Sequence, residues 1–291
     1  MIPLYDAHNH LQDPWLAPHR AALLRELPAL GVRGAVVNGT DETDWAGVAA
    51  LAAAAPWIVP GYGLHPWDAG NRSPDWQARL RAQLAADPQA AVGEIGLDRW
   101  MLDRAKPDDP RLAGLRRAPF DEQIEVFTWQ LALAAGQNRA ASIHCLDAWG
   151  ALNDILRVVR RPLRGFLLHA YGGPPEMVRG FAERGAYFSF NGAFLDPRKT
   201  RAREAFQLVP AERMLVETDA PAMLLPREHQ RHTLPATADG QPVNHPGNIA
   251  AAYAGLAELR GLAVEELAAQ VEQNFARLFG HAPGTPDAPR V

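Results

Sequence analysis

Short apolar segments, many of them rich in β-branched residues, alternate along this chain with longer segments in which apolar residues recur at helical spacing. The short segments predict eight strands, at residues 4–10, 34–38, 58–63, 91–97, 141–144, 165–170, 187–190 and 214–218. The longer segments between them predict helices at residues 17–30, 42–54, 75–86, 120–136, 147–160, 174–184 and 197–209. Because parallel neighbours need a crossover connection, usually a helix, this alternation is typical of an α/β protein with a (β/α)8 TIM barrel. A doubly wound open sheet remains the alternative.

The chain beyond the last predicted strand follows a different pattern. Residues 220–247 form a long irregular stretch rich in proline and histidine, and two helices are predicted to follow it, at residues 248–260 and 264–278. We expect one domain over residues 1–280 and a disordered tail over residues 281–291, which contain three prolines. Residues 100–118 predict an elaborated loop after the fourth strand.

Composition narrows the class of protein without changing the predicted fold. A chain of 291 residues with 47% apolar content can bury the core of one barrel domain. The net charge of −4 argues against wholesale wrapping of nucleic acid but leaves room for a local basic patch. No apolar run approaches the ~20 residues of a membrane-spanning helix, and Cys145 is the only cysteine, which excludes an internal disulfide. We expect a soluble, cytoplasmic protein, a monomer without an obligate protein partner.

Histidine and acidic residues gather at the ends of the predicted strands. His8 and His10 lie two residues apart in a strand, so both imidazoles point to the same face. Five further residues end, follow or lie in later strands: His65, Glu94, His144, His169 and Asp219. The carboxyl ends of barrel strands meet at one rim, which carries the active site in enzymes of this fold. We therefore expect these side chains to converge.

Taken singly, each of these residues has a simpler structural interpretation. A lone buried histidine is more often satisfied by a backbone carbonyl than bound to a metal ion. Glu94 could cap the next helix, and Asp219 could be an N-cap before Pro221. Together, inward-facing histidines and carboxylates would cost many kcal/mol in desolvation unless a partner neutralises them. A divalent cation is the simplest partner, and a set of nitrogen and oxygen ligands without sulfur suits Zn, Mn, Co or Mg.

The number of ligands favours two divalent ions that share a carboxylate. We assign one ion to His8, His10 and Asp219, the other to His144 and His169, and the bridging position to Glu94. Two ions ~3.5–4 Å apart would lower the pKa of a shared water and clamp the oxygens of a phosphoryl centre. We expect Asp219 to orient that water and accept its proton.

Two other sets of residues bear on this assignment. Some barrels of this kind bridge their ions with a carboxylated lysine, but neither Lys106 nor Lys199 lies at a strand end, so the bridge falls to Glu94. Asp6 and Glu217 either orient ligand imidazoles or serve as structural acids, two alternatives that remain open.

Seven motifs, in order along nearly the whole chain, resemble the TatD family of metal-dependent hydrolases. They are Asp6-Ala7-His8-Asn9-His10, Gly63-Leu64-His65-Pro66, Gly93-Glu94-Ile95-Gly96-Leu97-Asp98, Ile143-His144-Cys145, Leu168-His169-Ala170, Glu217-Thr218-Asp219-Ala220-Pro221 and Asn274-Phe275-Ala276-Arg277-Leu278-Phe279. The resemblance implies a TIM-type barrel with up to two divalent ions and a deoxyribonuclease activity, often that of a 3′ to 5′ exonuclease. It also implies that the family's ligands are His8, His10, Glu94, His144, His169 and Asp219. His65 would lie beside the scissile phosphate.

The chain departs from the family pattern at positions that contact substrate. Leu146 stands where many members have an arginine suited to phosphate, and Arg99 and Trp100 displace the aromatic residue that commonly follows Asp98. After the sixth strand, residues 171–173 replace the usual Phe-Ser-Gly region. These departures leave hydrolysis expected but keep a second hypothesis open, an amide, lactone or aminoacyl ester substrate, because activated water also attacks carbonyl centres. A non-catalytic barrel scaffold is the third hypothesis.

Substrate contacts are predicted from residues near the rim. Arginines in the two long loops could bind phosphate or be solvated surface: Arg99, Arg104, Arg116, Arg117, Arg227 and Arg231, with His232 beside them. Three tryptophans that follow strand ends could stack on the bases of a single-stranded DNA end or pack in the core: Trp67, Trp100 and Trp149.

Overall fold

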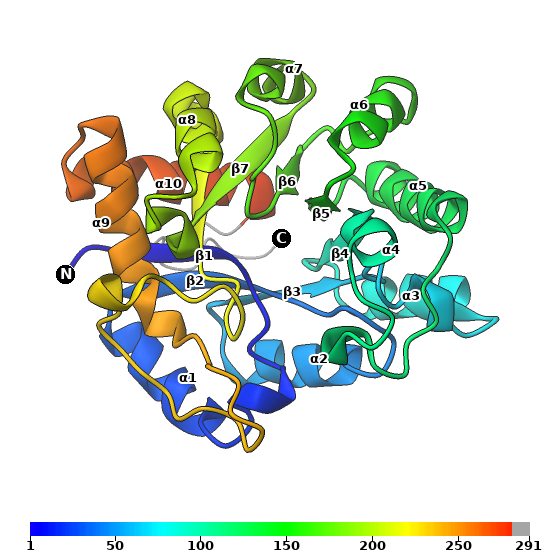
Figure 1. The fold of residues 1–291 in the computed structure, drawn as a ribbon, viewed down its shortest axis with the longest axis horizontal. Coiled ribbons are helices and arrows are strands. Elements are labelled where there is room, and N and C mark those ends of the chain that lie inside the picture. Colours follow the sequence, from blue (N-terminus) through cyan, green and yellow to red (C-terminus); the bar gives the residue numbers. More distant parts are fainter. Residues whose placement is uncertain (281–291) are drawn as a thin grey trace, which may run out of the picture.

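Eight parallel strands in sequential order form the centre of the fold (Figure 1). The computed structural model describes residues 1–280. The strands are β1 (Leu4–Asn9), β2 (Val32–Asn38), β3 (Ile58–Tyr62), β4 (Ala91–Asp98), β5 (Ala141–Leu146), β6 (Phe166–Leu168), β7 (Ala186–Asn191) and β8 (Met214–Glu217). A doubly wound sheet would reverse its strand order at a switch point. The predicted (β/α)8 barrel is therefore confirmed, and the open-sheet alternative is wrong.

Helices lie around the outside of the strands (Figure 1). They are α1 (Arg20–Ala29), α2 (Trp45–Ala54), α3 (Trp76–Ala86), α4 (Trp100–Asp103), α5 (Phe120–Gln137), α6 (Trp149–Val158), α7 (Val178–Glu183), α8 (Thr200–Leu208), α9 (Ile249–Arg260) and α10 (Val264–Phe279). The predicted loop after β4 contains the short helix α4 and a 3-10 turn at Pro110–Leu112. The predicted tail at residues 281–291 lies outside the described residues.

Element boundaries shift where backbone chemistry overrides the apolar pattern. The predicted strand at residues 165–170 spans only Phe166–Leu168, because Gly165 has a φ of +106° and Ala170 a φ of 41°, neither of which suits a strand. The predicted helix at residues 174–184 begins with a 3-10 turn at Pro175–Met177, since proline lacks the N–H that a helix interior needs.

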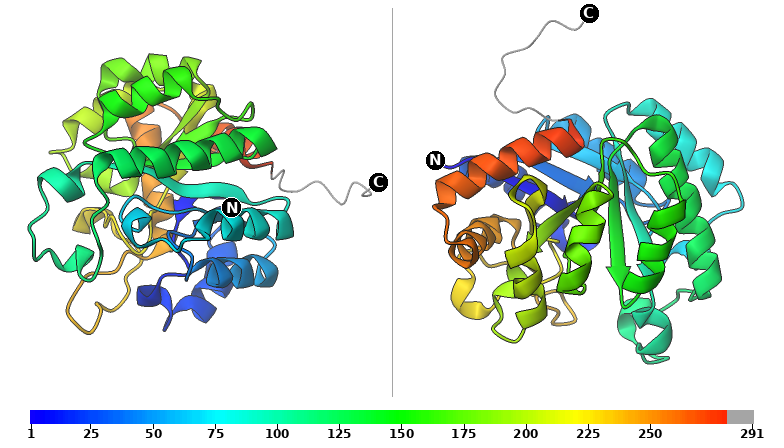
Figure 2. Two further views of the ribbon diagram at one scale, coloured as in Figure 1. Left: turned by 90° about the vertical axis from the view of Figure 1, so that its right-hand side faces the viewer. Right: turned by 90° about the horizontal axis from the view of Figure 1, so that it is seen from above.

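The barrel closes between β1 and the residues just after β8. The Asp219 N–H donates to the His8 carbonyl at 2.9 Å, and the His10 N–H donates to the Ala220 carbonyl at 2.8 Å. The buried Asp6 carboxylate accepts the Thr218 N–H at 3.0 Å and the Thr218 hydroxyl at 2.6 Å. Helices α9 and α10 contact both β1 and β8, side by side over this seam (Figure 2). The seam thus joins the first and last strands beside two predicted site residues.

The long connection between β8 and α9 is tied together at its base. The Asn244 N–H donates to the Pro221 carbonyl at 2.9 Å, and the Asn244 side chain donates to the Thr218 carbonyl at 3.1 Å. Further out, Asn248 accepts the N–H groups of Arg231 and His232, both at 2.9 Å. The predicted irregular stretch is therefore an ordered loop with hydrogen-bonded ends.

Helix α5 uses two buried glutamines to hold the strand ends that lead into the rim. Gln130 accepts the Leu64 N–H at 2.8 Å and donates to the Leu64 carbonyl at 3.1 Å. Gln123 makes the same pair of bonds with Asp98, at 2.8 and 3.1 Å. Each glutamine supplies hydrogen-bond partners to backbone groups at or beyond a strand end, which would otherwise be buried without hydrogen bonds.

The Gln130 clamp yields a stability prediction. We expect Gln130→Leu to lower the free energy of unfolding by about 2–4 kcal/mol, because it leaves a buried N–H and a buried carbonyl of Leu64 without partners. Urea denaturation measures the change. Gln137→Leu, at the exposed end of the same helix, is the matched control and should change stability by less than about 0.5 kcal/mol. Equal effects in the two variants would contradict the clamp.

Candidate metal centre

The structure brings all seven predicted site residues to the carboxyl-end rim of the barrel. His8, Glu94 and His144 lie in β1, β4 and β5, and the others follow strand ends: His10, His65, His169 and Asp219. His10 and His144 are partly exposed, and the other side chains are buried. Parallel strands that each end in a polar residue therefore collect ligand atoms from distant parts of the sequence.

The Glu94 carboxylate lies at the middle of this group. Its Oε2 atom lies 3.4 Å from the Nε2 atoms of both His8 and His10. Its Oε1 atom lies 2.7 Å from His169 Nε2 and 3.1 Å from His144 Nδ1. The two oxygens of one carboxylate thus face two different pairs of imidazoles.

Asp219 completes the first of these groups. Its Oδ1 atom lies 3.3 Å from His10 Nε2 and 3.7 Å from His8 Nε2. Asp219 has a φ of 52°, in the left-handed region that is uncommon for a residue with a side chain. The seam hydrogen bond from its N–H to the His8 carbonyl holds this conformation. Backbone closure and ligand placement therefore depend on the same residue.

Groups behind the imidazoles decide which ring nitrogen faces the centre. His10 Nδ1 donates to the Asn38 carbonyl at 2.8 Å, so Nε2 is the ring nitrogen that faces Glu94 and Asp219. His8 Nδ1 lies 2.8 Å from the Ser142 hydroxyl. His144 is turned the other way, with Nε2 against Asp98 Oδ2 at 3.2 Å and Nδ1 toward Glu94. Such partners fix the tautomer and orientation of ligand histidines in metal sites.

Several of these supporting residues were missed in the sequence analysis. Asn38 ends β2, and Ser142 stands two residues before His144 on β5, the spacing that puts both on one face. That spacing is the signal that could have found Ser142. Asp98 belongs to a motif that the sequence analysis quoted without giving this residue a role.

The two acids whose roles were left open behave differently. The Asp6 carboxylate accepts the N–H groups of His8 and Thr218 and the Thr218 hydroxyl, and within residues 1–280 it has no hydrogen bond to an imidazole; burial raises its pKa to about 7. Glu217 Oε1 lies 3.7 Å from His169 Nδ1 and accepts a hydrogen bond from the Asn191 side chain, while Glu217 Oε2 accepts one from the Ser189 hydroxyl. Asp6 is therefore a structural acid, whereas Glu217 faces a site histidine.

Protons balance the charge of this cluster. Burial opposes ionisation of Glu94, but the facing histidines, His169 foremost, hold its pKa well below the usual range. Burial likewise opposes protonation of His144, but hydrogen bonds to Asp98 and Glu94 raise its pKa to about 9. Carboxylates also raise the pKa of His10 and His169 well above the ordinary value. The imidazole nitrogens that these carboxylates favour in protonated form are the same nitrogens that would bind a cation.

The donor set fits a divalent metal ion. Ligand atoms of His8, His10 and Asp219 all lie within 4.8 Å of one another, as do those of His8, Glu94 and His169 and those of His65, Glu94 and His144. The buried His169 Nδ1 has no hydrogen-bond partner among the described residues. Nitrogen and oxygen ligands without sulfur suit the metals that hydrolases use.

His65 differs from the other histidines. Its Nδ1 accepts the Trp67 N–H at 3.2 Å, so in the neutral ring the proton lies on Nε2, which is 3.6 Å from Glu94 Oε1. Burial lowers the pKa of His65 to about 3, which keeps the ring neutral. His65 thus presents an N–H donor rather than a lone pair to the centre.

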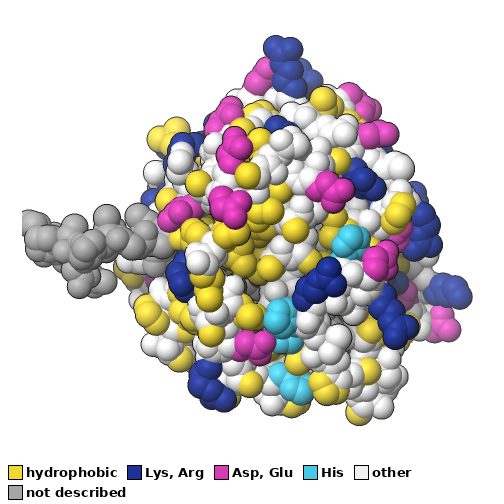
Figure 3. Space-filling model, turned by 90° about the vertical axis from the view of Figure 1, so that its left-hand side faces the viewer, with side chains coloured by type: hydrophobic (Ala, Val, Ile, Leu, Met, Phe, Trp, Pro, Cys, Tyr) yellow, Lys and Arg dark blue, Asp and Glu magenta, His cyan; other side chains and the backbone are white. Residues whose placement is uncertain are grey.

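A second cluster outside the rim joins Glu26 on α1 to the long loop. His232 Nδ1 lies 3.5 Å from Glu26 Oε1, and His245 Nε2 lies 3.6 Å from Glu26 Oε2. His245 Nδ1 accepts the Gly247 N–H at 2.9 Å, so the neutral ring carries its proton on Nε2 and directs it to Glu26. Several histidines reach the surface on the face that carries α9 (Figure 3). We interpret this cluster as a fastening of the loop to α1.

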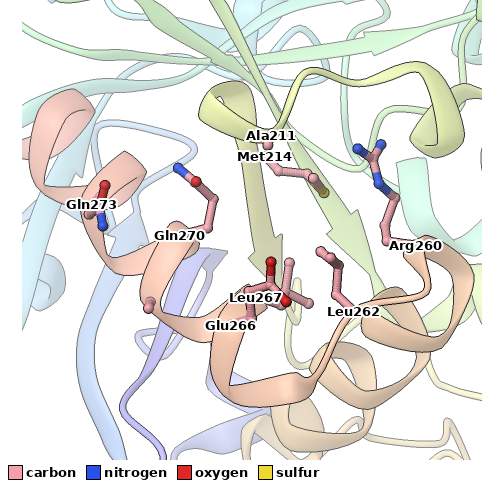
Figure 4. A pocket seen from close by; sticks show the side chains of 9 residues that line it. Ala211, Met214, Arg260, Leu262, Glu266, Leu267, Gln270 and Gln273 are labelled. Carbon is pink, nitrogen blue, oxygen red and sulfur yellow. The ribbon is translucent and has the colours of Figure 1, made fainter.

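A pocket of about 360 Å³ lies away from the rim, between α10 and the start of β8 (Figure 4). Met214, the first residue of β8, and Arg260 line it. Arg260 is engaged there, since it donates to the carbonyls of Phe206 and Val209 at the end of α8. Because Met214 begins β8, the pocket lies at the amino ends of the strands, opposite the histidine cluster.

None of the helices within residues 1–280 has the length and apolar character needed to cross a bilayer.

Most of the predicted substrate arginines have local partners. Arg116 and Arg117 bind Glu122 and backbone carbonyls within the loop after β4. Arg231 donates to the Glu228 carbonyl, and His232 faces Glu26. Arg104 is paired as well, since its Nε atom lies 3.2 Å from the carboxylate of Asp147, the residue after Leu146. The Arg104 side chain therefore lies near the end of β5, where the Leu146 carbonyl also accepts the Arg99 N–H at 2.9 Å.

Comparison with known proteins agrees with this geometry. A family model described as TatD related DNase matches residues 5–280. A protein named 3'-5' ssDNA/RNA exonuclease TatD from Escherichia fergusonii is 30% identical over 282 residues, which are 95% of this chain and 99% of that protein. The protein of the same name from Escherichia coli K12 is 32% identical over 259 residues, 87% of this chain and 89% of that one.

Solved structures show the same fold. The TatD homologue YJJV from Escherichia coli K12 superposes with a TM-score of 0.80 at 28% identity and covers 96% of this chain and 98% of its own. A TatD family hydrolase from Entamoeba histolytica has a TM-score of 0.76 at 15% identity, over 95% and 98% of the two chains. The predicted hydrolase barrel and the family resemblance are confirmed, and the scaffold hypothesis loses its support. With the family model spanning nearly the whole described chain, this protein belongs to the TatD-related DNase family of metal-dependent hydrolases.

Proposed function

We propose that this protein hydrolyses phosphodiester bonds at the ends of single-stranded DNA or RNA, using two divalent ions. The observation that carries the proposal is the position of the Glu94 carboxylate, whose two oxygens face separate groups of histidines. His8, His10 and Asp219 would hold one ion, and His144 and His169 the other, with Glu94 shared. The ions are Zn, Mn, Co or Mg, by the chemistry of the donors. The names of the relatives support the choice of substrate.

The chain's own residues contribute orientation and proton transfer. Bound divalent ions supply Lewis acidity to a phosphoryl oxygen and lower the pKa of a water molecule. Asp219 orients the attacking water and accepts its proton. His65 donates its Nε2 proton in a hydrogen bond to a phosphate oxygen, since its other nitrogen is occupied by the Trp67 N–H. Glu94, buried and ionised, holds the two halves of the site at a set separation.

A second candidate substrate is an amide, lactone or aminoacyl ester. Leu146, 38% exposed at the end of β5, favours it, because an apolar side chain there offers nothing to a phosphate. Arg104 beside Asp147 favours the phosphodiester, since it brings a guanidinium to the same edge. We further propose a cytoplasmic monomer that acts on a nucleic-acid end without an obligate partner; the single cysteine, Cys145, is consistent with a reducing compartment.

Replacing Glu94 tests the proposed centre and its substrate together. We expect Glu94→Gln to reduce bound metal below two ions per chain and to slow cleavage of end-labelled single-stranded DNA on the order of 10³-fold or more, because several kcal/mol of charge stabilisation are lost. Glu212→Gln, an exposed carboxylate at the other end of the barrel, is the matched control. Metal analysis and a cleavage assay measure both. If metal-loaded protein leaves DNA intact but cuts carboxylate esters in a Glu94-dependent way, the second candidate replaces the first.

Metal binding should release protons. At neutral pH the raised pKa values of His10, His144 and His169 keep protons on these rings, and a metal ion needs the same lone pairs. The affinity for metal ions should therefore rise with pH. The part of this rise that comes from deprotonation of His144 should end above its pKa of about 9. Isothermal titration of metal-free protein in buffers of different ionisation enthalpy measures the released protons. A binding heat that does not depend on the buffer would contradict this arrangement.

His65 should act on the reaction rather than on metal content. We expect His65→Ala to retain the metal content of the parent protein while kcat falls about 10²-fold to 10³-fold, as for loss of one donor to a developing charge. His144→Ala, at a proposed ligand, should instead lose bound metal. Metal analysis beside steady-state kinetics separates the two. Loss of metal in His65→Ala would make His65 a ligand and overturn its assignment as a donor.

A further inference from the structure

Two tryptophans form a wall beside the metal centre. Trp67 follows His65 by two residues, and their rings lie 5.4 Å apart edge to face. Trp100, the first residue of α4, lies 6.0 Å from Trp67 with the ring planes 32° apart. The Arg111 guanidinium lies over Trp100 at 4.2 Å. A continuous row of planar groups thus leads outward from the histidine that adjoins Glu94.

The wall is held to the centre through a single oxygen atom. Asp98 Oδ2 accepts the Trp67 indole N–H at 2.6 Å and lies 3.2 Å from His144 Nε2. The other oxygen of this buried carboxylate accepts the Met101 N–H at 2.8 Å, which fixes the start of α4. Trp67, α4 and a proposed metal ligand therefore keep their positions relative to one another.

The two rings take little part in core packing. Both are partly exposed, and among the described residues their aromatic and cation–π contacts are with each other, His65 and Arg111. Trp149, the third tryptophan considered from the sequence, packs instead on Tyr171 and Phe181 and supports α6 from the core side. Large aromatic surface held rigidly beside a reaction centre, yet open to solvent, is suited to a flat ligand.

Arg111, at the end of the row, presents the flat face of its guanidinium to Trp100, while its charge is paired with a carboxylate. Arg111 Nε and Nη2 both pair with the Asp109 carboxylate, at 2.9 and 2.8 Å. With its charge matched in this way, the guanidinium contributes chiefly its flat face to Trp100. Arg111 therefore extends the row of planar groups beyond Trp100.

We propose that Trp67 and Trp100 form a subsite that stacks on the base of the terminal nucleotide whose phosphodiester lies at the Glu94 centre. The inference rests on the proposed function and adds the basis of its selectivity. Base–aromatic stacking contributes ~1–3 kcal/mol per base and tolerates every base. A base inside a duplex already has both faces covered, so the subsite selects single-stranded or frayed ends without selecting sequence.

Removing either the ring or the base tests the subsite. The substrates are an end-labelled oligothymidylate and the same strand with an abasic terminal nucleotide. We expect the parent protein to prefer the intact strand by roughly tenfold to a hundredfold in kcat/KM, and Trp100→Leu to lose that preference, since each change removes the same stacking contact. Trp100→Phe should keep part of it. Trp57→Leu, a half-buried tryptophan at the amino end of β3, is the matched control and should leave the preference unchanged.

A binding measurement does not require turnover. Oligothymidylate should quench tryptophan fluorescence in Glu94→Gln, and the quenching should be smaller when Trp100→Leu is added but not when Trp57→Leu is added. Circular dichroism and the melting temperature confirm that each variant is folded. If Trp100→Leu lowered kcat/KM equally for the intact and the abasic strand, Trp100 would only support the loop after β4.

The outcomes separate the two proposals. If the parent protein cuts intact and abasic strands equally well, the stacking subsite is wrong and the nuclease stands. If it cuts neither strand while another ester is hydrolysed, the nuclease itself is wrong, and the subsite with it. Retained preference in Trp100→Leu also overturns the subsite, whatever the absolute rate.

Discussion

The burial of one carboxylate among imidazoles is the constraint on which this rim depends. Glu94 is 3% exposed, and its oxygens lie within 3.4 Å of four histidine nitrogens. An ionised carboxylate cannot stay in such a place unless positive charge surrounds it, and the histidines supply that charge only by binding protons. A cation satisfies the same requirement with the lone pairs freed. The site is therefore built so that protons and metal ions compete for the same space.

The rest of the barrel serves to hold these groups at set distances. Strand ends leave the sheet at the rim, and their backbone groups need new partners there. Gln123 and Gln130 provide them from α5, while the Tyr253 hydroxyl binds both the N–H and the carbonyl of Tyr5 from α9. Asn274 on α10 does the same for the start of β8, through the carbonyls of Ala211 and Met214. Buried side chains on the outer helices thus set where the catalytic strands begin and end.

The sequence predicted those site residues whose placement follows from their own strand, and it did not predict residues that act through contacts distant in sequence. Strand spacing placed His8 and His10 on one face, and the alternation of elements predicted a rim, so the convergence of the seven polar residues followed from the fold class. Asn38, Asp98 and Gln130 were not found, because each acts on a residue far away in sequence and its own neighbours give no indication of that contact. Trp67 and Trp149 show the same limit. Both follow strand ends, and only the packing around them separates an exposed wall from a core support.

The hydrogen-bonded base of the loop between β8 and α9 has a consequence for variation in this chain. Pro221 and Asn244 are joined across the loop, and Asn244 also binds the Thr218 carbonyl directly before Asp219. The loop between these anchors can become longer or shorter at small entropic cost, because chain closure depends only weakly on length. Asp219, which we propose as the catalytic aspartate, is insulated from such changes. The loop is therefore the part of this rim that is free to diversify in evolution while hydrolysis itself is preserved.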